Sequence, residues 1–115
     1  MATLYGIRNC DTMKSARAWL DAKGVRYDFH DYKAAGIERV LLEGWVREMG
    51  WEALLNRSGT TFRKLPDADK QGIDARKAIE LMLAQPSMIR RPVLDTGAAR
   101  IVGFQPDQYA ETLEA

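Results

Sequence analysis

The sequence predicts a mixed α/β fold, and three observations lead to that prediction. A β-prone run at 2–7 is followed by apolar residues at helical spacing over 11–23, and then by alternation of apolar and polar residues over 25–30. Two further short β-prone runs lie within 93–104, and the long stretch before them has mainly helical periodicity. A strand, a helix and a strand therefore come first, and a pair of strands comes late.

The first thirty residues predict a strand pair joined by one helix. Met13, Ala16 and Leu20 would lie on one face of that helix. Gly24 stands where a glycine commonly ends a helix. A strand–helix–strand unit of this kind almost always crosses over with a right hand between parallel strands. We therefore expect the first two strands to pair in parallel.

A helical insertion is predicted over about 35–90. One helix is expected over 37–49 and a short helical turn over 51–56, whereas the polar, glycine-bearing stretch 57–73 is expected to have little regular structure. The apolar residues expected to form one face of the first of these helices are Leu41, Trp45 and Met49.

The rest of the chain completes the fold. Asp74 is a good N-cap for a helix over 75–84. Two strands, 93–95 and 100–104, flank a Thr-Gly-Ala turn and predict a hairpin, and a short helix over about 107–113 follows. A βαβ half followed by a ββα half is the order of a thioredoxin-like domain. The predicted fold class is therefore α/β and thioredoxin-like, with a helical insertion between the two halves.

Length and composition exclude several classes of protein. The 115 residues fit one domain, since domains usually span about 50–250 residues, and 46% are apolar. One cysteine and one histidine exclude a disulfide framework and a zinc site built from several such residues. A net charge of +1 gives no general attraction to nucleic acid, and no run approaches the about 20 apolar residues of a membrane span. Without an export signal, we expect a cytoplasmic protein with a reduced thiol.

Cys10 is the candidate nucleophile. It stands where the first predicted strand gives way to the first helix, and the N–H groups and dipole at a helix N-terminus stabilise a thiolate. Lys14, one turn further on, adds positive charge, whereas Asp11 opposes the effect unless it points away. The alternative is a buried, inert cysteine, since free cysteines are usually buried. The polar flanking residues, among them Asn9 and Thr12, favour exposure and reactivity.

The thiol at this position has no second cysteine to work with. A dithiol motif would need a cysteine at position 13, where Met13 stands, and Cys10 is the chain's single cysteine. A mixed disulfide at Cys10 must then be resolved by an external thiol, for which glutathione is the abundant cytosolic candidate. We expect no metal, flavin or nucleotide cofactor.

Arginines and one proline complete the candidate site. Arg57, Arg90 and Arg91 are candidates for anion contacts, because a guanidinium pairs two-pronged with carboxylates and oxyanions. The alternative for each is solvated surface charge. Pro92 precedes the third predicted strand, and in a thioredoxin-like fold the Arg91–Pro92 bond is expected to be cis and to face the cysteine. Four residues are expected to be structural: His30, Tyr27, Trp45 and Trp51.

Three segments are distinctive together, in this order and spacing: YGIRNCDTMKSARAWL, LLNRSGTTFRKL and MIRRPVLD. They resemble the arsenate reductase (ArsC)/Spx family, and most of all its YffB-like branch of small ArsC-type reductases. The resemblance covers nearly the whole chain and implies a thioredoxin-like fold with a helical insertion.

The resemblance also carries residue roles. In the arsenate reductases a cysteine attacks the oxyanion, and three arginines surround it. Cys10 matches that cysteine, Arg57 the first arginine and Arg91 the second, whereas Gly103 stands in the place of the third, which argues against arsenate reduction. The Spx branch consists of transcription regulators that bind RNA polymerase and sense oxidation through a Cys-x-x-Cys pair, which Met13 removes.

The resemblance thus implies a glutathione-dependent thiol/disulfide reductase with Cys10 as the catalytic residue. Arsenate-type oxyanion reduction and an Spx-like regulatory adaptor that binds RNA polymerase are the alternatives. The expected partners are glutathione and glutaredoxin, with no direct nucleic-acid contact, no membrane contact and a monomeric state. The residues expected to bind glutathione or substrate are Asn9, Thr12, Lys14, Arg57, Arg91 and Pro92.

Overall fold

The computed structural model describes residues 2–114, and the chain divides into two compact units. The first unit contains the described residues up to Ala35 together with those from Arg91 onward, and the second is Gly36–Arg90. Each unit has its own set of elements and is described by itself.

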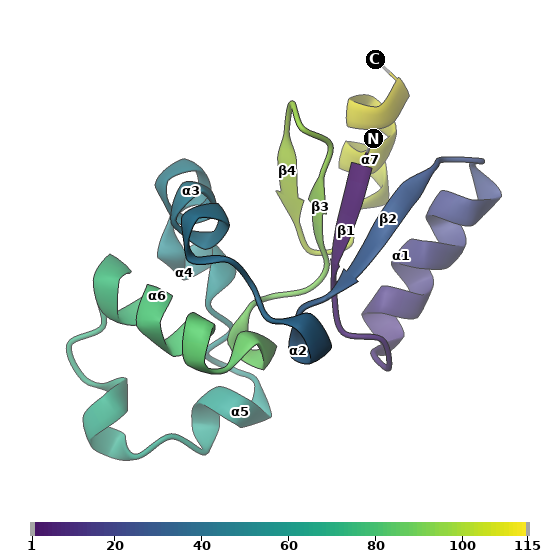
Figure 1. Cartoon of the computed structure of the whole chain (residues 1–115). Helices are drawn as coiled ribbons and strands as arrows, with labels where there is room; N and C mark the ends of the chain where they lie inside the picture. Colours follow the sequence, from purple (N-terminus) through teal and green to yellow (C-terminus); the bar gives the residue numbers. More distant parts are fainter. Residues whose placement is uncertain (1, 115) are drawn as a thin grey trace. The chain divides into compact units, whose positions relative to one another are not determined.

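The first unit is built on a four-stranded sheet in the order β2-β1-β3-β4 (Figure 1). β1 pairs with β2 in parallel, with Gly6 opposite Asp31, whereas the β1–β3 and β3–β4 pairs are antiparallel. The predicted α/β, thioredoxin-like fold with a βαβ half and a ββα half is therefore confirmed. The four strands are β1 (Ala2–Gly6), β2 (Tyr27–Asp31), β3 (Val93–Asp95) and β4 (Arg100–Val102).

Two helices pack against this sheet. Helix α1 (Asp11–Ala22) joins β1 to β2, and α7 (Pro106–Glu114) follows β4. Met13, Ala16 and Leu20 are fully buried, as their helical spacing predicted, because that face of α1 covers the sheet. The other buried members of this core cluster are Ala2, Leu4, Leu94, Ile101 and Tyr109.

The second unit is helical. Its helix α6 (Ala75–Ala84) begins as predicted, since the Asp74 carboxylate accepts a hydrogen bond from the Lys77 N–H at 2.9 Å and so caps the helix. The short helix α2 (Tyr32–Ala35) precedes this unit, at the end of β2. The other elements are α3 (Arg39–Met49), α4 (Trp51–Leu54), α5 (Thr60–Arg63) and 3₁₀ turns at Asp67–Lys70 and Pro86–Met88.

Two predictions for the second unit need correction. The helix predicted over 37–49 forms and buries Trp45, but it begins at Arg39. The rest of its buried face is Leu42 and Val46, whereas the predicted Leu41 and Met49 are half-buried. The apolar residues of this helix fit more than one stripe, and packing of α3 against α6 and α4 selects one of them. The stretch 57–73 is also more regular than predicted, because burial of Phe62 stabilises one helical turn.

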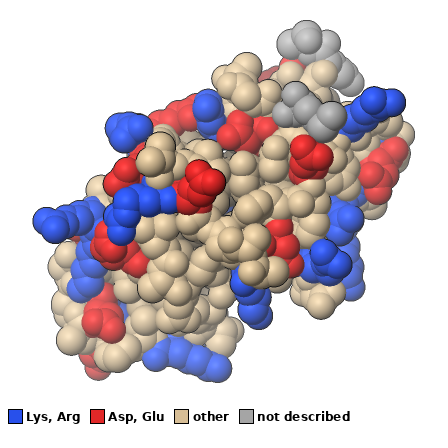
Figure 2. Space-filling view, viewed as in Figure 1, with Lys and Arg blue, Asp and Glu red and all other residues tan. Residues whose placement is uncertain are grey.

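The described surface carries mixed charge. Lysine and arginine side chains are interspersed with aspartate and glutamate side chains on the face shown in Figure 2, in keeping with a net charge of +1. Within residues 2–114, no helix is long and apolar enough to cross a membrane.

Candidate active site

Cys10 is the N-cap residue of α1. Its backbone is extended (φ −132°, ψ 133°), and its carbonyl oxygen accepts the first helical hydrogen bond from the Lys14 N–H at 3.0 Å. The end of β1 packs tightly against α1, since a Cβ at Gly6, the last residue of β1, would overlap the thioether of Met13. The end of β1 and the first turn of α1 therefore fix the position of the sulfur. Cys10 is a free thiol of intermediate burial, so the alternative of a fully buried cysteine does not hold, and its reactivity stays a prediction.

Arg91 brings a positive charge to this sulfur from the far end of the chain. Its Nε donates to Cys10 Sγ at 3.5 Å across 81 positions of sequence. The pairing of β3 with β1 makes this contact, because Arg91 lies just before β3 and Cys10 lies just after β1. Pro92, between Arg91 and β3, is buried, and the predicted cis Arg91–Pro92 peptide bond is confirmed.

The pKa of Cys10 lies below the ordinary value of a cysteine thiol. Partial burial of the sulfur raises this pKa, but the Met13 amide, the Arg91 guanidinium and the Thr12 amide together lower it by more. Neither amide makes a complete N-cap hydrogen bond to the sulfur. The Met13 amide makes the largest single contribution that lowers this pKa, and Arg91 contributes both a hydrogen bond and a formal positive charge.

Tyr32 and Asp31 belong to the same cluster and were missed by sequence reasoning. Tyr32 is fully buried, and its hydroxyl is hydrogen-bonded to the Arg91 side chain. Asp31 Oδ2 accepts from the Arg8 N–H at 3.4 Å, in the loop before Cys10. One signal in the sequence pointed to them: the carboxyl ends of parallel strands lie at one edge of a sheet, so residues that follow β2 lie near those that follow β1.

The backbone at Gly103, which the family resemblance aligns with the third arginine, favours glycine. Gly103 has φ +83°, a conformation that side chains other than glycine rarely adopt. Its N–H donates to the Pro92 carbonyl oxygen at 2.8 Å, and its own carbonyl accepts from the Tyr109 hydroxyl at 3.3 Å. The glycine thus connects the end of β4 to the segment that carries Arg91.

Thr12 and Lys14 contact Cys10 through their backbone rather than through the side chains that were expected to act. The side chains of Asn9, Thr12 and Lys14 are exposed. The backbone N–H of Thr12 faces the Cys10 sulfur. The backbone N–H of Lys14 donates a hydrogen bond to the Cys10 carbonyl oxygen. Arg91 therefore supplies the cation that acts on the sulfur, and a charge contribution from Lys14 stays a prediction.

Two predicted arginines belong to the second unit. Arg57 is exposed, and its guanidinium lies 5.3 Å from the ring centre of Trp51, a cation–π contact that orients it. Arg90 is also exposed, and its backbone N–H donates to the Leu54 carbonyl at 2.7 Å. Their roles in anion binding stay predictions. Trp51 is half-buried, whereas Trp45 is buried in the core as expected.

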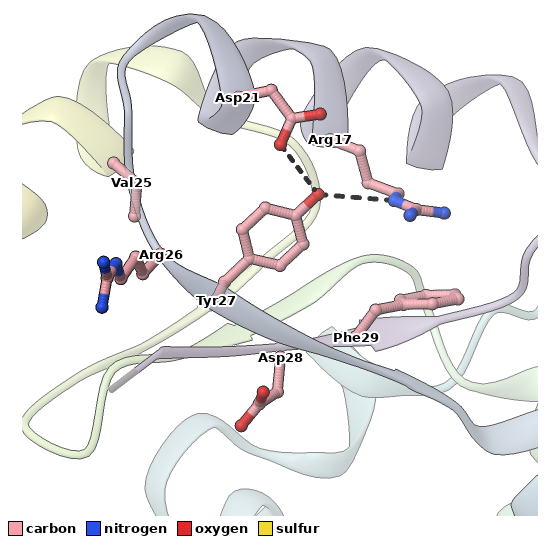
Figure 3. Close-up of a pocket in the computed structure, with 7 residues that line it drawn as sticks. All are labelled: Arg17, Asp21, Val25, Arg26, Tyr27, Asp28 and Phe29. Atoms are coloured by element: carbon pink, nitrogen blue, oxygen red, sulfur yellow. Dashed lines mark hydrogen bonds between the residues drawn. The ribbon is translucent and has the colours of Figure 1, made fainter.

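A shallow hollow elsewhere on the first unit is not the candidate site. It is lined by the second half of α1 and the start of β2 (Figure 3). The Tyr27 hydroxyl donates to Asp21 at 3.3 Å and accepts from Arg17 Nε at 3.4 Å, and the Arg17 guanidinium lies 4.6 Å from the Phe29 ring centre. The polar groups of these side chains are therefore hydrogen-bonded to one another. Cys10 is not among the described residues that line the hollow. In the described part of the chain, no group of three His, Cys, Asp or Glu residues could hold a metal ion.

Known proteins resemble this chain over nearly its full length. The model of the ArsC family matches residues 5–112. A solved structure named YffB is 62% identical, with a TM-score of 0.95 and coverage of 98% of this chain and 99% of that one. An arsenate reductase (ArsC) related protein from Brucella melitensis is 52% identical, with a TM-score of 0.76 and coverage of 99% and 95%. The global transcriptional regulator Spx of Streptococcus mutans is 28% identical over 110 residues, which is 94% of this chain and 80% of that protein.

Proposed function

Because the chain belongs to the ArsC family, we propose that it is a thiol/disulfide oxidoreductase with Cys10 as its nucleophile and glutathione as the external thiol. The observation that supports this most directly is the contact of Arg91 Nε with Cys10 Sγ at 3.5 Å. The guanidinium favours the thiolate, which is the reactive form of cysteine in thiol–disulfide exchange. A partly exposed thiolate beside one arginine suits attack on a disulfide carried by a peptide or another protein.

The reaction proceeds in two exchanges. First, the Cys10 thiolate attacks the glutathione sulfur of a substrate–glutathione disulfide: the Cys10–glutathione bond forms, the substrate disulfide breaks, and the departing substrate thiolate takes a proton from water. Second, a glutathione thiolate attacks the glutathione sulfur of the mixed disulfide and releases the Cys10 thiolate and glutathione disulfide. The substrate gains two electrons and a thiol proton, and two glutathione units end as one disulfide.

Each candidate residue has a role in this proposal. Arg91 favours the ionised form of Cys10. Arg91 and Arg57 bind carboxylates of glutathione, and for Arg57 this role rests on the family resemblance alone. The exposed residues Asn9 and Thr12 donate hydrogen bonds near the reacting sulfurs. Pro92 orients the bound peptide, and Lys14 adds positive charge near it. In keeping with its thiol chemistry and a glutathione supply, we propose a cytoplasmic location.

Arsenate reduction is the second candidate, favoured by the similarity to the Brucella protein. Arsenate needs several converging donors, and each charged hydrogen bond contributes about 1.5–3 kcal/mol net. With Gly103 in the third arginine's place, the site forfeits one or two such bonds, equivalent to arsenate capture weaker by at least about tenfold. We therefore expect little or no arsenate turnover. Efficient reduction with glutathione and glutaredoxin supplied would contradict this expectation.

A regulatory role is the third candidate, favoured by the similarity to Spx. Met13 stands where a redox switch would need its second cysteine, so an oxidation-sensing disulfide within the chain is excluded. Binding of the purified protein to RNA polymerase would support this role over catalysis.

The decisive experiment mixes the protein with glutathione disulfide and measures the intact mass. We expect an adduct of one glutathione, absent from Cys10→Ser and removed by added reduced glutathione. Arg91→Ala and Arg57→Ala should each slow adduct formation, whereas Arg90→Ala, a neighbouring exposed arginine, should have a much smaller effect. Failure of the unmodified protein to form the adduct would refute the proposed function.

A further inference from the structure

A buried hydroxyl lies behind the arginine that contacts Cys10. Tyr32 is 0% exposed and follows β2 directly, and its hydroxyl is hydrogen-bonded to the Arg91 side chain. Arg91 Nε, which carries a single N–H, donates to Cys10 Sγ. The other N–H groups of the guanidinium are then the donors available to Tyr32, so the arginine spans the sulfur and the hydroxyl.

We propose that Tyr32 is a positioning residue for Cys10, because its hydroxyl holds the Arg91 guanidinium against the sulfur. An arginine side chain loses considerable rotamer freedom when it is held in one position, and a lone contact of 3.5 Å to sulfur is weak compensation. A second hydrogen bond, donated by the guanidinium to a fixed, buried hydroxyl, makes the productive orientation of Arg91 the populated one. The proposal rests on the proposed function, since it assigns to Tyr32 the maintenance of the reactive thiolate.

The position of Tyr32 is itself secured by Asp31. One carboxylate oxygen, Oδ1, accepts from the Lys33 and Ala34 N–H groups at 3.0 and 3.2 Å and so orders the turn that carries Tyr32. The other, Oδ2, accepts from the Arg8 N–H at 3.4 Å. Because Arg8 lies in the loop before Cys10, this carboxylate ties the tyrosine's segment to the cysteine's segment.

Tyrosine is suited to this task because its hydroxyl stays neutral. Burial raises the pKa of Tyr32 far above its ordinary value, and Arg91 lowers it by less. The ionisable groups that act on Tyr32 are Arg91, Cys10 and Asp31. A neutral hydroxyl accepts a hydrogen bond from the guanidinium without cancelling its charge, whereas a carboxylate at this position would compete with the thiolate for Arg91.

The test measures the rate of Cys10 alkylation by iodoacetamide against pH, which follows the thiolate fraction without any glutathione. Tyr32→Phe removes only the hydroxyl, and we expect the midpoint to rise by about half a pH unit, an about threefold smaller thiolate fraction at lower pH. Tyr109→Phe is the matched control: Tyr109 is also 0% exposed in the first unit, but its hydroxyl donates to the Gly103 carbonyl. We expect no shift in that variant.

A double substitution separates positioning from a general structural effect. In an Arg91→Gln background, Tyr32→Phe should produce no further shift of the midpoint, because the hydroxyl acts through the guanidinium. An unchanged midpoint in Tyr32→Phe, or shifts that simply add in the double variant, would overturn the proposal. If glutathione forms no adduct while these shifts appear, the proposed function fails and the role of Tyr32 stands.

Discussion

Replacing Arg91 with glutamine removes the positive charge beside the Cys10 sulfur and keeps a polar side chain there. In wild type, Arg91 Nε lies 3.5 Å from the sulfur, and both groups are only partly buried. Two unit charges about 4 Å apart interact by about 1 kcal/mol in water and about 4 kcal/mol at the effective dielectric of a protein surface. Solvent screening at a half-exposed site favours the lower end of this range.

The expected result is a Cys10 pKa about one unit higher in Arg91→Gln, since one unit corresponds to 1.36 kcal/mol. At a pH below both midpoints, the thiolate fraction then falls about tenfold. The shift should not be larger, because the amides of Met13 and Thr12 also lower the pKa and remain in place.

Thiolate absorbance in the ultraviolet, followed through a pH titration, measures this midpoint directly. Cys10→Ser provides the baseline, because its titration contains every other group of the chain. Arg90→Gln removes the same charge one position away, from an exposed side chain, and should leave the midpoint of Cys10 within about 0.2 unit of wild type. Equal midpoints in wild type and Arg91→Gln would show that the contact with Arg91 does not set the reactivity of the thiol.

Two further predictions concern stability. The folded pKa of Cys10 is lowered, so the free energy of unfolding of wild type, relative to Cys10→Ser, should increase as pH rises from below the folded pKa to about 8.5 and then level off. Urea unfolding at a series of pH values measures this difference in free energy. A difference that falls as pH rises would contradict the lowered pKa. Gly6→Ala should destabilise the fold by about 1–3 kcal/mol, because the added Cβ overlaps the fully buried Met13 side chain; urea unfolding with no change in midpoint would show that Met13 has room to move.

Local patterns in the sequence were enough to predict most elements of the first unit. The face of α1 could be read from Met13, Ala16 and Leu20, because a helix repeats every 3.6 residues and this stripe has one consistent phase. The N-cap at Asp74 depends on a side chain and a backbone N–H three positions apart, so it too is local information. The helix over 39–49 was harder, because its apolar residues fit several stripes and only neighbouring helices select one.

The candidate site also has one part that the sequence predicts and one part that depends on the fold. Cys10 at the start of a helix was predictable from the sequence by itself, because the end of a strand and the beginning of a helix are both local signals. The sequence named Arg91 as a candidate, but only the structure shows that its Nε contacts the sulfur and that Tyr32 lies behind it. These contacts join segments far apart in the chain, and they exist because β1 pairs with β2 on one side and with β3 on the other. Strand order is a property of the folded sheet, and no local pattern in the sequence encodes it.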